Sequence, residues 1–148
     1  MNTNKLWMRF LMAGLLLALL LTTACAKENV IQSSTGQALV EQGNAYMTCL
    51  KDGNIQGALD RMSSKARITL GSAVQLAGSW VDLESKIKNE IALDKWTFES
   101  AYVITVDGSL RGILDGKVAH VDGKSGKIHL EFDQENGAWM VRNSSMEE

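Results

Sequence analysis

Three turn dipeptides divide the second half of the chain into segments of strand length, and this division constrains the fold most. They are Asp107-Gly108, Asp122-Gly123 and Asn136-Gly137. Asp-Gly and Asn-Gly are typical of tight β-turns, and Asn-Gly is a strong signal for a two-residue hairpin loop. The turns separate four segments, which are 96–106, 110–121, 127–133 and 138–143. The first of them is rich in β-branched and aromatic residues, as strands are. We therefore expect an antiparallel meander of four strands.

The third of these segments also indicates how the sheet is oriented. Three apolar side chains alternate there with three polar ones, His129, Glu131 and Asp133; the apolar ones are Ile128, Leu130 and Phe132. Such alternation predicts one face packed on a core and one face in contact with water. Gly112 and Gly116, in the second segment, favour a bulge or bend in a curved sheet.

The residues before the strands have helical periodicity. Ser33, Ser34 and Thr35 offer N-cap hydroxyls, and Asp52-Gly53 is a typical helix end. Asn54 can cap a short second helix whose apolar stripe runs from Ile55 to Met62, and a third helical stretch extends loosely over 72–93. Helices followed by an antiparallel meander predict an α+β fold, with the helices packed in a curved four-stranded sheet.

The first 25 residues have the pattern of a bacterial lipoprotein signal. Lys5 and Arg9 precede an apolar run over 11–21, and Thr22-Thr23-Ala24 stand before Cys25. A membrane-spanning helix needs roughly 20 apolar residues, a length that the run barely reaches even when it is counted from Leu6. We expect 1–24 to be a signal peptide, with Cys25 lipidated and the protein anchored at the outer face of a membrane in the cell envelope. Ordinary secretion with a free Cys25 is the alternative, because Thr22 stands where the consensus prefers leucine.

The rest of the chain forms one domain after a short polar segment. We expect 25–34 to be a polar tether and 35–148 to be the domain. Removal of 1–24 takes away Lys5 and Arg9 and no acidic residue, so the net charge changes from −2 to −4. This mild acidity argues against nucleic acid as a partner. Cys49 lies in an apolar stretch and is expected to be a buried thiol, since buried cysteine behaves as a small hydrophobe.

The order of these elements resembles the nuclear-transport-factor-2-like superfamily. The resemblance is carried by the short helix over 54–60, the segment that contains Trp80, and the closing phrase from Val121-Asp122-Gly123 to Asn136-Gly137-Ala138-Trp139. It implies a cone, in which a curved sheet wraps around helices and leaves a pocket at the open end. A cystatin-like sheet on one helix is the alternative fold. The superfamily includes isomerases, cyclases, transport adaptors and many non-enzymes, so it fixes no chemistry.

The candidate pocket residues are those that such a cone would expose on its inside. They are Trp80, Tyr102, Asp115 and Trp139, with aromatic core filling as the alternative for the aromatic ones. No residue is assigned a catalytic role, and no cofactor is expected. If the Asp122-Gly123 turn closes with a four-residue loop that pairs Val121 with Ile128, His120 lies opposite His129. We expect both imidazoles to face solvent and to bind no metal, because no third ligand is evident.

These observations predict a lipid-anchored, non-catalytic binding module. Its expected ligand is a small hydrophobic molecule or a partner protein of the envelope, and a homodimer through the sheet is a further expectation. The alternative is an isomerase or dehydratase that uses a carboxylate or histidine in the cone as its base.

Overall fold

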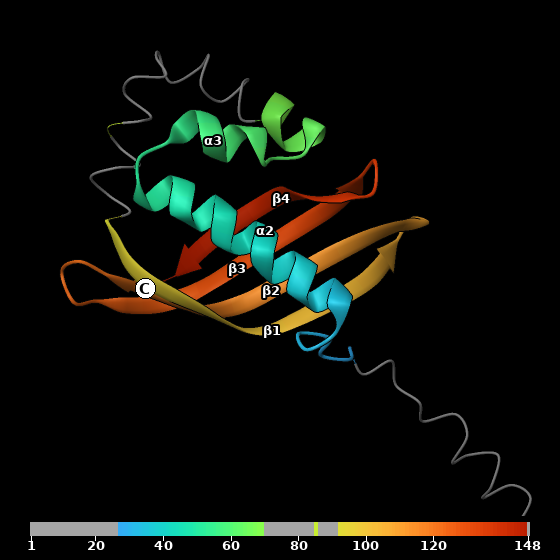
Figure 1. Ribbon diagram of the computed structural model, residues 1–148, viewed down its shortest axis with the longest axis horizontal. Coiled ribbons are helices and arrows are strands. Elements are labelled where there is room, and N and C mark those ends of the chain that lie inside the picture. The colour runs from blue at the N-terminus through green and yellow to red at the C-terminus, as the bar shows by residue number, and fades with distance from the viewer. Residues whose placement is uncertain (1–26, 70–84, 86–91, 148) are drawn as a thin grey trace, which may run out of the picture.

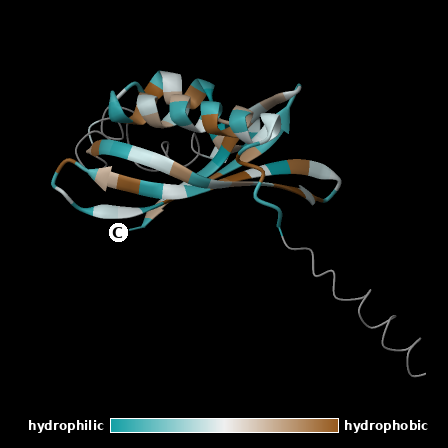
Figure 2. Cartoon of the chain, turned by 60° about the horizontal axis from the view of Figure 1, so that its bottom comes forward, coloured by the Kyte–Doolittle hydropathy of each residue, from teal (hydrophilic) through white to brown (hydrophobic). Residues whose placement is uncertain are grey.

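A single antiparallel sheet of four strands is the base of the fold (Figure 1). The computed structural model describes residues 27–69, 85 and 92–147. The strands follow one another in the sheet as in the chain, and they are β1 (Leu93–Val106), β2 (Ser109–His120), β3 (Ser125–Glu135) and β4 (Ala138–Glu147). Helices α2 (Ser34–Lys51) and α3 (Ile55–Asp60) lie over one face of this sheet (Figures 1 and 2). The predicted α+β class and the four-stranded meander are confirmed.

Two of the three predicted turns are two-residue hairpin loops. Asp107 and Gly108 have φ angles of 50° and 76°, and Asn136 and Gly137 have φ angles of 51° and 82°. Positive φ at both central residues is the conformation that matches the twist of the flanking strands. The third turn is longer, because the four residues from Val121 to Lys124 separate β2 from β3.

Helix α2 begins and ends where its capping residues predict. The Ser33 hydroxyl accepts a hydrogen bond from the amide of Gly36 at 3.1 Å, and Gly53 follows the last turn with a φ of 67°. Leu39 and Met47 on this helix are fully buried. Helix α3 is likewise capped by Asn54, whose side chain accepts from the amide of Gly57 at 2.9 Å.

The core fills the space between α2 and the sheet. A side-chain Cβ added at Gly112 would lie 2.4 Å from Leu39 Cδ2, and one added at Gly43 would lie 2.7 Å from Leu114 Cδ1. The helix and the sheet are therefore in close contact at Gly43 and Gly112, because a larger residue at either position would clash with the side chain opposite it. The strand residues in the core come from all four strands and include Phe98, Ala101, Leu114, Val118, Ile128, Leu130, Phe132, Trp139 and Val141. Cys49 is buried in the same cluster, as predicted.

The chain departs from the predicted second helix after Asp60. The amide of Val141 donates to the carbonyl of Arg61 at 2.8 Å, and the amide of Ser63 donates to the carbonyl of Val141 at 2.7 Å. Residues 61–63 thus leave the helix to satisfy backbone groups at the open edge of β4, which would otherwise lack partners. Met62, predicted to be helical, lies in this bridge.

The predicted third helix over 72–93 lies almost entirely outside the described residues, and so does Trp80. The end of that predicted range is an exception. Leu93 is the first residue of β1 and is buried.

The domain begins earlier than the predicted boundary at residue 35. The amide of Val30 donates to the carbonyl of Ala101 at 2.7 Å, and Asn29 Oδ1 accepts from the amide of Ala101 at 3.0 Å. Val30 and Ile31 also pack against the core cluster. Two apolar side chains in the predicted tether are thus partly buried beside β1. Within the described residues, only Lys27 and Glu28 precede this contact. Among the described residues, no helix is long and apolar enough to cross a membrane.

The buried phenol of Tyr46 should make stability depend on alkaline pH. Its hydroxyl lies 3.2 Å from Ser144 Oγ, and burial raises the pKa of Tyr46 above its ordinary value of 10.0, although the hydrogen bond acts in the opposite direction. A raised pKa means that the stabilisation is fully present below the unfolded pKa and is lost as the pH rises through the folded one. Urea unfolding of Tyr46→Phe should show a shallower loss of stability above about pH 10 than the unchanged chain. Equal slopes in the two proteins, or the same change of slope in Tyr102→Phe, would contradict this assignment.

Candidate functional site

The face of the sheet turned away from α2, here called the outer face, carries most of the charged side chains of the strands. In the register of the sheet, Thr97, Lys117, Lys127 and Glu147 form one row across the four strands. The next row is Ser100, Asp115, His129 and Ser145. Two adjoining hollows lie over these rows.

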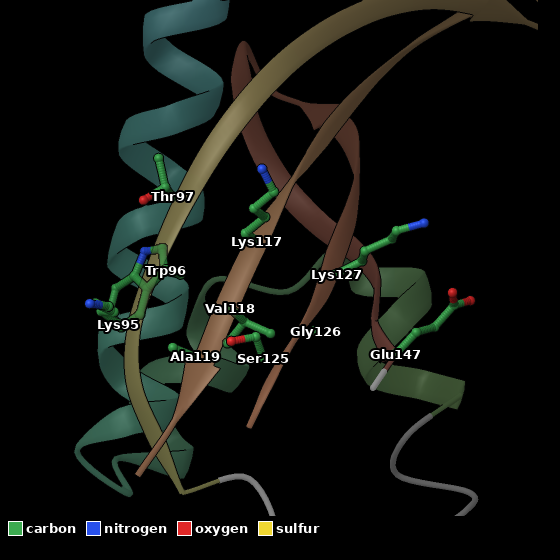
Figure 3. Close-up of a pocket in the computed structure, with 10 residues that line it drawn as sticks. All are labelled: Lys95, Trp96, Thr97, Lys117, Val118, Ala119, Ser125, Gly126, Lys127 and Glu147. Carbon is green, nitrogen blue, oxygen red and sulfur yellow. The ribbon is translucent and has the colours of Figure 1, made fainter. Parts of the chain in front are cut away.

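The first hollow, here called the lysine hollow, has a volume of about 500 Å³. Its lining includes Lys95, Lys117 and Lys127, which come from β1, β2 and β3 (Figure 3). Ala119 and Ser125, which are paired across β2 and β3, lie between these long side chains and are too short to fill the space. Glu147 is the one carboxylate in the lining.

The second hollow, of about 480 Å³, shares Lys117, Lys127 and Glu147 with the first. It contains Asp115 and His129, which are directly paired across β2 and β3. His129 Nδ1 lies 2.5 Å from Asp115 Oδ1, and His129 Nε2 lies 3.6 Å from Glu131 Oε1. The imidazole is thus held between two carboxylates, which fixes the orientation of its ring.

A charged network continues from this histidine towards the hairpin end of β3 and β4. Arg142 Nη1 lies 3.2 Å from both carboxylate oxygens of Asp133, and Arg142 Nε lies 3.9 Å from Glu131 Oε2. Arg111 Nε lies 4.0 Å from Asp133 Oδ1. These side chains are about one-quarter exposed, so the pairs are partly shielded from water.

Removal of the central arginine of this network should lower stability modestly. Arg142→Met keeps the length of the side chain but leaves Glu131 and Asp133 without their shared cation. We expect the free energy of unfolding to fall by about 1 kcal/mol, since ion pairs that are partly shielded from water and belong to a network lie at the upper end for surface pairs. Lys117→Met, which breaks a more exposed pair with Glu99 at 2.6 Å, is the matched control and should cost less. Urea denaturation measures both, and a larger loss for Lys117→Met would contradict the ranking.

The predicted pairing of the two histidines is wrong. His129 pairs with Asp115, whereas the amide of His120 donates to the carbonyl of Lys124 across the turn. The reason is that β3 begins at Ser125, two residues before the predicted start at Lys127, and Ser125 pairs with Ala119 of β2. Among the described residues, no three His, Cys, Asp or Glu side chains are placed to hold a metal ion.

The predicted pocket residues do not line one cavity. Trp139 is buried in the core on the helix side of the sheet. Asp115 lies in the second hollow of the outer face, and Tyr102 is paired with Ile113 on that same face. Trp80 lies outside the described residues. Of the three that the structure describes, Tyr102 and Asp115 lie on the same side of the sheet, and Trp139 lies on the other.

The lysine hollow was not predicted from the sequence. Lys95, Lys117 and Lys127 are far apart in the chain, and they meet only in the true register of β1, β2 and β3. The predicted register displaced β3 along β2, so Lys117 and Lys127 were not recognised as neighbours. The available signal was the run Gly126-Lys127-Ile128, whose alternation continues back into Ser125.

Comparisons with known proteins give a similarity of structure but none of sequence family. Neither protein-family models nor curated proteins match the chain. Among solved structures, the chain is similar to an NTF-2 like protein of unknown function from Shewanella oneidensis, with 9% sequence identity and a TM-score of 0.48. The match covers 77% of this chain and 99% of that protein. A similarity of this strength assigns neither a family nor an activity to the chain.

Proposed function

We propose that the protein is a lipid-anchored binding module of the bacterial cell envelope, and that it binds its partner through the outer face of its sheet. One observation carries the proposal. The space directly beneath α2 is filled by the protein's own side chains, and the hollow beside α2 is lined mainly by uncharged residues such as Ile31, Val40 and Phe98. The outer face presents two adjoining hollows with charged linings. Binding sites are typically concave and carry a few polar groups in fixed positions.

The anchor is supported by the leader pattern that ends at Cys25 and by the docking of the following segment. Asn29 and Val30 are fixed to β1 by their hydrogen bonds with Ala101. Four residues, 25–28, separate the lipid from this point, and a fully extended chain of that length spans about 14 Å. The proposed anchor would therefore hold the β1 side of the domain close to the membrane surface.

The partner that fits the outer face is polar. The small hydrophobic ligand expected from a cone would need space beneath α2, where Leu39 and Leu114 are in contact with the glycines opposite them. An enzyme that uses a base inside the cone would need a buried carboxylate or imidazole, and among the described residues no Asp, Glu or His is buried. A charged or polar partner on the outer face needs neither.

The anchor is tested with Cys25→Ser in the bacterial host. The unchanged chain should fractionate with membranes, and its intact mass should correspond to a chain that begins at Cys25 and carries lipid. Cys25→Ser should lose the lipid mass and leave the membrane fraction, because contact between the protein surface and the lipid headgroups is much weaker than anchoring by acyl chains. Cys49→Ser is the matched control and should stay in the membrane fraction. Membrane retention of Cys25→Ser would contradict the proposed anchor.

A further inference from the structure

We propose that the lysine hollow binds a phosphate group. The inference rests on the proposed function, because it takes the outer face as the binding surface and names the chemistry that this surface recognises. It is carried by the arrangement of Lys95, Lys117 and Lys127 around the small residues Ala119 and Ser125.

The register places two lysines in an unfavourable position. Lys117 and Lys127 are directly opposite each other on neighbouring strands, and like charges in such pairs destabilise a sheet. Lys117 is compensated by Glu99, whose Oε1 lies 2.6 Å from its ammonium group. Neither Lys127 nor Lys95 forms an ion pair with any of the described residues. Glu147 lies opposite Lys127 on β4 and offsets part of this repulsion, but it forms no ion pair with Lys127. An anionic ligand would supply the partner that Lys95 and Lys127 lack, and departures from local stability rules are typical of functional sites.

The charge of the hollow opposes that of the rest of the domain. Three lysines and Glu147 give its lining a net charge of +2, which becomes +1 when the Glu99 carboxylate paired with Lys117 is included. The chain from residue 25 has a net charge of −4, because the −2 of the whole sequence includes Lys5 and Arg9. An anion is therefore attracted to this part of the outer face and repelled by most of the remaining surface.

A phosphate group fits these donors by chemistry and by reach. Each lysine offers three N–H donors on a flexible stem, and Ser125 adds a hydroxyl between them. In Figure 3 the ammonium groups of Lys95, Lys117 and Lys127 point away from one another, and each flexible stem can turn its ammonium group towards an anion in the hollow. Glu147 lies opposite Lys127 at the β4 edge of the hollow, and its negative charge repels an anion there. We therefore expect a phosphate group to enter the hollow from the β1 side.

Two sources can present such a phosphate, a lipid headgroup or a soluble molecule. Lys95 lies on β1, six residues before Ala101, where the N-terminal segment is docked. Along a strand this separation is about 20 Å, so the anchor and the hollow share one edge of the domain. The experiment distinguishes the two sources.

The test uses the chain from residue 25 with Cys25→Ser, which contains the whole described core. One arm titrates inorganic phosphate and follows the amide resonances of Ser125 and Gly126. The other arm measures cosedimentation with phosphatidylcholine vesicles with and without phosphatidylglycerol. Lys95→Gln and Lys127→Gln should each weaken binding about fivefold, the effect of one lysine near an anionic group. Lys65→Gln, an exposed lysine outside the hollow, is the matched control.

Each outcome bears on the proposal. Saturable resonance shifts with inorganic phosphate that the two variants weaken support it with a soluble source. Binding only to vesicles with phosphatidylglycerol, weakened by the same variants, supports it with a lipid source. No binding of either probe, or equal effects of Lys127→Gln and Lys65→Gln, would overturn it. If the anchored protein binds neither inorganic phosphate nor the vesicles but contacts a partner through its outer face, the proposed function holds and the phosphate site does not.

Discussion

Replacing Phe132 with alanine should lower the free energy of unfolding by about 4 kcal/mol, because large-to-small changes of buried aromatic residues cost roughly 3–5 kcal/mol. Phe132 is fully buried in β3, opposite Gly112 on β2 and Val141 on β4. Gly112 has no side chain that can move into the vacated space, so the cavity stays open. Equilibrium urea unfolding, followed by tryptophan fluorescence, measures the change.

The control for this substitution is an apolar residue that lies next to the sheet and outside the core. Val121, in the turn after β2, is 72% exposed. Val121→Ala should change the free energy of unfolding by less than about 0.5 kcal/mol. A loss below about 1 kcal/mol for Phe132→Ala would show that the space between α2 and the sheet is not closely packed, contrary to the fold described above.

Alanine in place of Gly116 should destabilise the protein by about 3 kcal/mol, although it adds a single methyl group. A Cβ at this position would lie 2.1 Å from the carbonyl oxygen of Thr97 and 2.9 Å from Phe98 Cα. Both atoms are backbone, so no side-chain rotation relieves the contact. The neighbouring register shift in β1, between Phe98 and Ser100, is where the strand must move to make room.

The matched control is Gly123→Ala, in the turn between β2 and β3. A Cβ there meets nothing within 4 Å, but the φ angle of 87° is unfavourable for alanine. Its cost should be about 1 kcal/mol and conformational in origin. Thermal unfolding by circular dichroism ranks the two variants. A loss for Gly123→Ala as large as that for Gly116→Ala would mean that the close approach of β1 and β2 at Gly116 does not constrain the fold.

Local signals predicted the elements whose ends depend on local chemistry. Ser33 and Gly53 define the two ends of α2 by capping, and Asn136-Gly137 defines a hairpin by its φ angles. In these cases the residue that determines the structure lies within a few positions of the structure that it determines. The prediction and the structure agree for that reason.

Contacts that depend on strand register could not be predicted in the same way. The turn at Asp122-Gly123 and its four-residue loop were recognised, but the pairing of the strands on either side was not. A register shift of an odd number of residues moves side chains to the opposite face. His120 was therefore paired with His129 in place of Asp115, and the opposition of Lys117 and Lys127 was missed. Met62 is a similar case, because the edge of β4 determines its backbone conformation and no local pattern indicates it.

Placement of a site also needed the packing of the core. A large aromatic residue such as Trp139 is equally suited to filling a core and to lining a pocket, and the structure places it in the core. Asp115 follows two buried apolar residues in the sequence, yet the alternation of β2 turns it to the outer face, where His129 is its partner.

The central claim is that the outer face of the sheet, and not the helix side, is the contact surface of an anchored protein. Site-specific photocrosslinking in intact cells tests it most directly, with the photoreactive residue placed at Thr97 or Ser145 on the outer face, or at Glu41 or Gln56 on exposed positions of α2 and α3. We predict adducts from Thr97 and Ser145 and none from the helix positions. The adduct mass will show whether the partner is a phospholipid, another protein or a second copy of the chain. Adducts from Glu41 and Gln56, with none from the outer face, would contradict the account.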